Sequence, residues 1–121
     1  LMLHTIGSDH SETTGDAWLE RYIFPNGMLP SAAQITAAAE NRFVLEDWHN
    51  LGPDYDRTLM AWEKNFEAAW PELKQRYGAP FRRMWRYYLL FCAGLFRARR
   101  TNVWQIVFSP QGVRGGYAAV R

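Results

Sequence analysis

The stretch Val103-Trp104-Gln105-Ile106-Val107-Phe108 decides the fold of this 121-residue sequence. It is rich in β-branched and aromatic residues and follows the turn residues Thr101-Asn102, so it predicts a strand. Two further apolar runs predict strands at residues 1–6 and 43–48. These three strands are the framework between which the predicted helices lie.

Two short helices are predicted between the first two strands. Asp16 stands where an N-cap is expected for a helix from Ala17 to Phe24. Ser31 followed by Gln34 has the spacing of a capping box, which predicts a second helix from Ala32 to about Ala39.

Two long helices are predicted between the second and third strands. The first begins at residues 52–54, and its apolar face carries Leu59, Trp62, Phe66, Trp70, Leu73 and Tyr77. Pro71 is expected to kink or restart this helix because proline lacks a backbone N–H. The second begins at Pro80, and its apolar face carries Phe81, Met84, Trp85, Tyr88, Cys92, Leu95 and Phe96.

The order of these elements predicts an α/β fold with about three strands and four helices. Three strands are roughly half of an ordinary sheet, which suggests that the sequence is part of a larger domain. A loose tail from Gly112 onward is expected to add at most a short strand. One cysteine in the whole sequence excludes a disulfide framework.

Charge is unevenly distributed along the sequence. Residues 1–60 carry 3 arginines and 9 acidic residues, whereas residues 61–121 carry 11 basic and 3 acidic residues. No acidic residue follows Glu72, so Arg82, Arg83 and Arg86 are expected to form a basic helix face that no carboxylate neutralises. An anionic lipid surface fits such a face. Nucleic-acid binding is not expected, because the neighbouring aromatic residues fall on the predicted core face.

Few residues are candidates for chemistry. His4 lies near the end of an apolar strand, where α/β sheets place their sites, although a structural role fits it too. Glu46 and His49 have a metal-like spacing, but in a strand they point to opposite faces, so no metal site is predicted. Tyr55 stands at a helix start, where capping does not explain it. Cys92 fits a small buried hydrophobic residue better than a nucleophile.

Five segments together resemble one known family, the cyclopropane-fatty-acyl-phospholipid synthases, with the mycolic acid cyclopropane synthases as near relatives. The resemblance extends from Leu1 to about Phe108, in order and with matching spacing. The segments are His4-Thr5-Ile6-Gly7-Ser8, Tyr22 to Ser31, Glu46-Asp47-Trp48-His49-Asn50, Asp54 to Trp62 and Tyr88 to Arg97.

The resemblance implies the carboxy-terminal half of a class I, Rossmann-like S-adenosylmethionine-dependent methyltransferase sheet. Residues 1–121 would then form the later part of a single domain, with the fifth, sixth and seventh strands and one of them antiparallel. The glycine-rich cofactor motif of the family lies upstream of these segments. The sequence is therefore expected to hold no cofactor-binding residue and to be inactive alone.

The same resemblance implies a set of site residues. His4 corresponds to a side-chain ligand of a catalytic bicarbonate, Ile6 to a backbone ligand and Tyr55 to a hydroxyl donor. Phe24 matches an aromatic residue that lines the acyl channel. Glu46 matches a residue that supports the bicarbonate ligands and does not itself bind the anion. Cys92 matches a cysteine that has been placed in the active site of relatives.

The implied function is the addition of a methylene group across the double bond of unsaturated phospholipid acyl chains, with bicarbonate as the base. The implied partners are membrane phospholipid, an anionic membrane surface at the inner face of the cytoplasmic membrane and a second copy in a homodimer. The alternative is a truncated, non-catalytic protein or pseudoenzyme that docks on anionic membranes through its arginine-rich helices.

Overall fold

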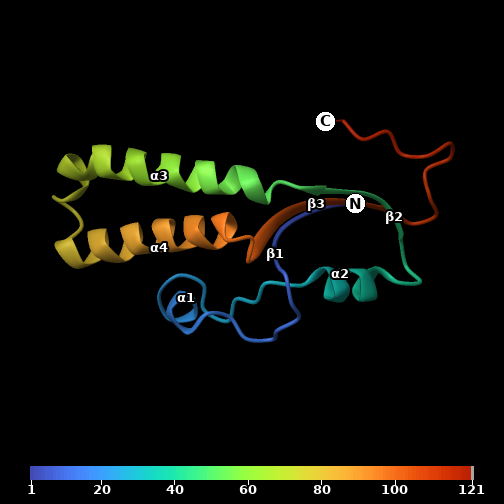
Figure 1. Cartoon of the computed structure of the whole chain (residues 1–121), viewed down its shortest axis with the longest axis horizontal. Helices are drawn as coiled ribbons and strands as arrows, with labels where there is room; N and C mark the ends of the chain where they lie inside the picture. Colours follow the sequence, from blue (N-terminus) through green and yellow to red (C-terminus); the bar gives the residue numbers. More distant parts are fainter. Residues whose placement is uncertain (121) are drawn as a thin grey trace. The chain divides into compact units, whose positions relative to one another are not determined.

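The computed structural model describes residues 1–120 and contains two compact units. Unit 1 comprises Leu1–Gly52 together with the segment from Thr101 onward, and unit 2 comprises Pro53–Arg100. Unit 1 contains three strands and two short helices, and unit 2 is a helical hairpin; these elements are labelled in Figure 1. Each unit is described by itself below.

The sheet of unit 1 has three strands: β1 (Met2–Ser8), β2 (Val44–Asn50) and β3 (Thr101–Ser109). Their order is β1-β3-β2, and β3 is antiparallel to both neighbours. The predicted strands and the antiparallel strand are thus confirmed. β1 and β2 begin one residue later and end two residues later than predicted, and β3 is longer by two residues at its start and one at its end. Because β1 and β2 both oppose β3, their carboxyl ends lie at the same edge of the sheet.

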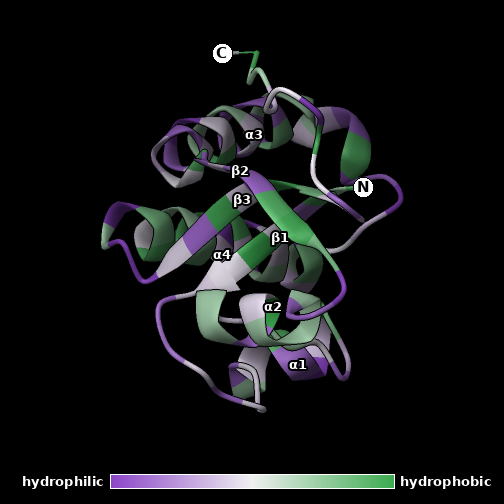
Figure 2. Ribbon diagram, turned by 90° about the vertical axis from the view of Figure 1, so that its right-hand side faces the viewer, coloured by the Kyte–Doolittle hydropathy of each residue, from purple (hydrophilic) through white to green (hydrophobic). Residues whose placement is uncertain are grey.

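The alternation of side chains along β3 divides the sheet into two faces. Trp104, Ile106 and Phe108 point to one face and form a core with Ile35 of α2 (Ala32–Ala39). Ile106 is fully buried, and Leu3 and Trp48 from the neighbouring strands pack against this cluster. Figure 2 shows α2 against this region of the sheet, mostly on the hydrophobic side of its colour scale.

Both predicted N-caps of the short helices are present. The Asp16 carboxylate accepts hydrogen bonds from the backbone N–H groups of Trp18 and Leu19, both at 3.0 Å, at the start of α1 (Ala17–Tyr22). α1 ends at Tyr22, two residues before the predicted end.

The capping box of α2 is complete. Ser31 Oγ accepts from Gln34 N at 3.1 Å, and Gln34 Oε1 accepts from Ser31 N at 2.8 Å. Ser31 is buried, and the backbone N–H of Ser8 donates to the Pro30 carbonyl at 3.0 Å. The start of α2 is therefore fixed to the end of β1.

Unit 2 is a hairpin of α3 (Gly52–Leu73) and α4 (Ala79–Arg97), which Figure 1 shows side by side. α3 continues through Pro71 and ends two residues later, so the predicted restart at Pro71 is wrong. A proline so near the carboxyl end removes one of the last intrahelical hydrogen bonds only. α4 has Pro80 in its first turn, as predicted.

The buried face of α4 is rotated from the predicted one. Its buried residues are Leu89, Ala93 and Phe96, of which only Phe96 belongs to the predicted apolar face. Tyr88 and Cys92 are half-buried instead. After β3, residues 110–120 form bends, turns and irregular chain, consistent with the loose tail that was predicted.

Candidate functional site

His4 and Ile6 lie on the same face of β1, because alternate residues of a strand share a face. This face is opposite to the one covered by α2. His4 is exposed and Ile6 half-buried. His4 and Ile6, which are predicted to bind one anion, therefore lie on the same face of one strand.

Gly7 follows these residues at a point of close approach. It is buried, and a Cβ atom built on it would lie only 2.0 Å from Cζ3 of Trp104. Because Gly7 lacks a side chain, the indole ring of Trp104 can approach the carboxyl end of β1 closely. The strand that carries His4 and Ile6 is thus held to the core of unit 1 at this end.

Tyr55 lies in the first turn of α3 and belongs to unit 2. Its half-buried ring packs against Phe96 of α4, with ring centroids 5.4 Å apart, and against Trp62 at 6.4 Å. These contacts fix the ring of Tyr55 within the hairpin. Tyr55 is therefore held by unit 2, whereas His4 and Ile6 are held by unit 1.

Phe24 lies in the loop that follows α1 and is 49% exposed. Its backbone N–H donates to the Leu19 carbonyl at 2.8 Å, and its carbonyl accepts from Gly27 N at 2.9 Å. Tyr22, Met28 and Leu29 of the same segment are also exposed. This segment thus presents several large apolar side chains to the surface.

Glu46 is the extra residue of a β-bulge in β2, where the register with β3 shifts between Leu45 and Asp47. Its carboxylate accepts hydrogen bonds from the Ser109 hydroxyl and, at 2.7 Å, from the backbone N–H of Val113. Glu46 therefore connects the end of β3 to the tail that follows. It lies toward the amino end of β2, away from the edge where β1 and β2 end.

Cys92 is half-buried on α4, one helical turn after Tyr88. Burial, with a smaller contribution from Cys92, raises the pKa of the Tyr88 hydroxyl. Both residues lie in unit 2, so the structure does not bring Cys92 together with His4 on one unit.

The arginines of α4 differ from the prediction. Arg82 forms an ion pair with Glu67 of α3, and Arg86 Nε lies 2.7 Å from Glu63 Oε1. The predicted basic face without neutralising carboxylates is therefore wrong for two of its three residues. The acidic partners precede Glu72 in the sequence, and the hairpin brings them opposite α4.

These ion pairs predict a dependence of stability on pH. Hydrogen bonds from Arg82 and Arg97 hold the pKa of Glu67 and Asp56, respectively, below the ordinary values of 4.5 and 3.8. A carboxyl with a lowered folded-state pKa contributes stability above its unfolded-state pKa and loses it as the pH falls through the folded value. The thermal midpoint should therefore fall as the pH drops below about 4.5.

Replacement of Glu67 by glutamine should make this acid-induced fall shallower. Thermal unfolding followed by circular dichroism between about pH 7 and pH 3 checks the prediction. Glu72→Gln, an exposed change near the end of the same helix, is the control and should keep the slope of the unchanged chain. Equal slopes for Glu67→Gln and Glu72→Gln would contradict the prediction.

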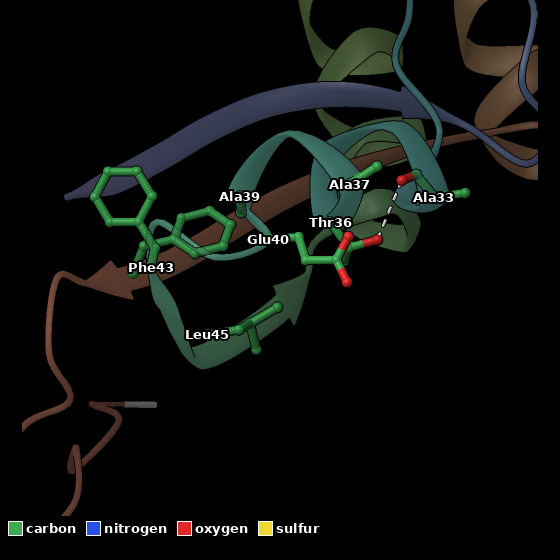
Figure 3. A pocket seen from close by; sticks show the side chains of 8 residues that line it. Ala33, Thr36, Ala37, Ala39, Glu40, Phe43 and Leu45 are labelled. Carbon is green, nitrogen blue, oxygen red and sulfur yellow. Dashed lines mark hydrogen bonds between the residues drawn. The ribbon is translucent and has the colours of Figure 1, made fainter.

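A shallow groove lies between α2, the start of β2 and the end of β3 (Figure 3). Its lining is mostly apolar: Ala33, Thr36, Ala37, Ala39, Glu40, Phe43, Leu45 and Phe108. Glu40 is the only titratable group in this lining, so the groove lacks the donors that an anion needs. None of the predicted site residues lines it.

Gln105 is a functional candidate that the sequence analysis missed. It is the one polar residue in the otherwise apolar segment 103–108, and its Nε2 lies 3.3 Å from His4 Nδ1. The sequence contained a signal, since an amide inside an apolar strand must find a polar partner. The register that supplies His4 as that partner became visible only in the structure.

Two general features concern all described residues. Among residues 1–120, no group of three or more His, Cys, Asp or Glu side chains is arranged to hold a metal ion. No helix within the described part is long and apolar enough to cross a membrane.

Comparison with protein families gives a match over most of the sequence. The model of the mycolic acid cyclopropane synthetases matches residues 1–106. The chain belongs to this family.

Related proteins and structures agree with this membership. The cyclopropane-fatty-acyl-phospholipid synthase of Escherichia coli K12 is 54% identical over 120 residues, which are 99% of this chain and 31% of that relative. This family member thus spans about a third of the relative's length.

Solved structures of the family have the same α/β fold. The cyclopropane synthase MmaA2 from Mycobacterium tuberculosis matches with a TM-score of 0.78 at 26% identity, covering 88% of this chain and 42% of that one. The mycolic acid cyclopropane synthase CmaA1, solved in complex with SAH and CTAB, matches with a TM-score of 0.77 at 25% identity and the same coverage.

Proposed function

We propose that this chain is the carboxy-terminal part of an S-adenosylmethionine-dependent methyltransferase that forms cyclopropane rings on unsaturated acyl chains of membrane phospholipids. The observation that carries the proposal is the 54% identity, over nearly the whole chain, with the E. coli enzyme named cyclopropane-fatty-acyl-phospholipid synthase. The SAH complex of CmaA1 supports S-adenosylmethionine as the methyl donor.

The residues of this chain do not fit the cofactor itself. The sequence lacks a Gly-x-Gly-x-x-Gly turn, and so it lacks the usual combination of a glycine turn with a later acidic partner for a ribose. We therefore assign no residue of this chain to S-adenosylmethionine and propose that its site lies mainly outside the chain.

Bicarbonate fits the donors that the chain does supply. Imidazole, backbone amide and phenol are neutral donors, which hold an anion and leave its basicity largely intact. We propose that His4, the backbone of Ile6 and the hydroxyl of Tyr55 hold bicarbonate. When bound, it supplies the base that takes the proton released on ring closure.

The finer proposals follow from the same assignment. Phe24, in its exposed apolar loop, contacts the acyl chain of the substrate, and Cys92 remains a candidate residue of the site. We propose a protein that works as a homodimer on the anionic inner face of the cytoplasmic membrane. The alternative, a non-catalytic protein that docks through Arg82, Arg83 and Arg86, loses support because two of these arginines pair with glutamates.

The test uses a chimaera of the E. coli relative in which this chain replaces the 120 residues that it matches. The chimaera should convert unsaturated phospholipids to cyclopropane lipids, detected by gas chromatography of the fatty acid methyl esters, and should require bicarbonate. Calorimetry of the 121-residue chain alone should show no binding of S-adenosylmethionine.

Two results would contradict the proposal. One is a chimaera that folds, as judged by circular dichroism, but forms no cyclopropane lipid under conditions in which the unmodified E. coli enzyme is active. The other is tight binding of S-adenosylmethionine by the chain alone, which would show that the cofactor site has been misplaced.

A further inference from the structure

A row of three polar residues crosses the sheet of unit 1. His4 on β1, Gln105 on β3 and His49 on β2 are direct partners in the register, so they share one face. This face is opposite to the one that packs on α2. Of the other titratable groups, Asp47 lies on the same face of β2, two residues before His49.

The contact between the first two residues of the row favours one tautomer of the His4 ring. Gln105 Nε2 lies 3.3 Å from His4 Nδ1, across 101 residues of sequence. An amide nitrogen is a donor and has no free electron pair to accept a hydrogen bond. With Nε2 of the amide turned toward the ring, His4 Nδ1 is the acceptor of this contact, and the proton of a neutral ring is then on Nε2.

The other ring nitrogen of His4 is left for a ligand. His4 is exposed, and no hydrogen bond to its Nε2 is found among residues 1–120. A neutral imidazole in this tautomer presents a single N–H donor from Nε2. This is the group that an anion needs from a neutral partner.

We propose that Gln105 is a positioning residue that holds His4 in the Nε2–H tautomer, with Nε2 directed at the bound bicarbonate. The inference rests on the proposed function, in which His4 is a ligand of that anion. Gln105 acts through His4 and does not itself contact the anion.

The position of Gln105 in the fold suits this role. β3 is the central strand and pairs on both sides, and the neighbouring residues Trp104 and Ile106 are only 5% and 0% exposed. A shift of the strand would displace these core side chains, so the backbone of Gln105 is held in place. The amide is thus a fixed donor on which the ring of His4 can be oriented.

An amide is also better suited here than a carboxylate. A glutamate at position 105 would accept a hydrogen bond from Nδ1–H and would favour the opposite tautomer or a charged imidazolium. A charged ring would bind bicarbonate more tightly but would lower its basicity. A leucine would leave the ring free to rotate and to exchange tautomers.

The experiment compares Gln105→Leu and Gln105→Glu in the chimaera, with Val107→Ala as the matched control. Val107 lies on the same strand and face as Gln105, but its side chain has no group that can form a hydrogen bond with His4. It pairs with Met2 and Asp47. Its replacement reports what a general weakening of β3 does to activity.

Three results are expected. Gln105→Leu should raise the bicarbonate KM by about tenfold, the loss of roughly one hydrogen bond, and added bicarbonate should restore the rate. Gln105→Glu should lower kcat, and bicarbonate should not restore it. The ¹⁵N chemical shifts of labelled His4, assigned with a His4→Ala variant, should show a proton on Nε2 in the unchanged chimaera and lose this preference in Gln105→Leu.

The outcomes separate this inference from the proposed function. If His4→Ala leaves the bicarbonate dependence unchanged, the proposed bicarbonate site is wrong. If His4→Ala abolishes that dependence while Gln105→Leu behaves as Val107→Ala does, the site stands and the role of Gln105 is overturned. A proton on Nδ1 of His4 in the unchanged chimaera would also overturn it.

Discussion

Replacement of Tyr55 by phenylalanine in the chimaera is expected to lower kcat by roughly 10²–10³-fold, with little change in the binding of S-adenosylmethionine. The change removes one hydroxyl and keeps the ring, so the packing of Tyr55 against Phe96 at 5.4 Å is retained. Loss of a hydrogen bond to a group that reacts in the transition state lowers kcat much more than loss of one that only helps a ligand to bind. Steady-state turnover at several bicarbonate concentrations gives the measurement.

Tyr88→Phe is the matched control for this experiment. Tyr88 lies in the same unit, and its half-buried hydroxyl has a pKa raised mainly by burial, but it is not assigned to the anion. Removal of its hydroxyl should leave kcat nearly unchanged. Full activity of Tyr55→Phe at low bicarbonate would show that Tyr55 does not hold the anion.

Replacement of Gly7 by alanine is expected to destabilise the chain by roughly 1–3 kcal/mol, the usual cost of overpacking a core. In an open strand position the same change would be favourable by about 0.5–1 kcal/mol, because glycine loses more backbone entropy on folding. The added methyl carbon would lie 2.0 Å from Cζ3 of Trp104, so the steric cost outweighs the gain. Urea denaturation followed by circular dichroism measures the difference.

Two further variants test the cause of this loss. Gly94→Ala on α4 adds the same methyl group at a position where, beyond its chain neighbours and the backbone of its own helix, no described atom lies within 4 Å, and it should stabilise the chain. In a Trp104→Leu background, Gly7→Ala should cost much less, because the side chain with which it clashes is gone. An equal cost of Gly7→Ala in both backgrounds would refute the steric explanation.

Local features of the fold were predictable from the sequence, because the residues that decide them are neighbours. Asp16 and Ser31 cap the helices that follow them, and residues 103–108 form a strand. The end of a helix was less predictable. Pro71 suggested a break, but a proline near the last turn removes few hydrogen bonds and α3 includes it.

Features that depend on distant residues were not predictable. Arg82 and Arg86 are predicted to lie on a basic face without neutralising carboxylates, because no acidic residue follows them in the sequence. Their partners Glu67 and Glu63 precede them, on α3. The buried face of α4 is rotated toward Leu89 and Ala93, because the neighbouring elements decide which side of an aromatic helix is covered.

The candidate site was predictable only in part, for the same reason. His4, Ile6 and Tyr55 came from the resemblance, and the structure adds which unit holds each of them. Gln105 became visible only through its register with His4.

The central place of β3 decides when the sheet can form. Its partner residues on β1 lie about a hundred positions earlier in the chain, as the pair His4 and Gln105 illustrates, 101 residues apart. During synthesis β1 and β2 therefore emerge long before the strand that joins them, while the α3–α4 hairpin closes through nearby contacts such as Phe66 with Phe81. Contacts between distant residues form slowly, because a long loop must close first. The sheet of unit 1 can thus be completed only after β3, through Ser109, has been synthesised.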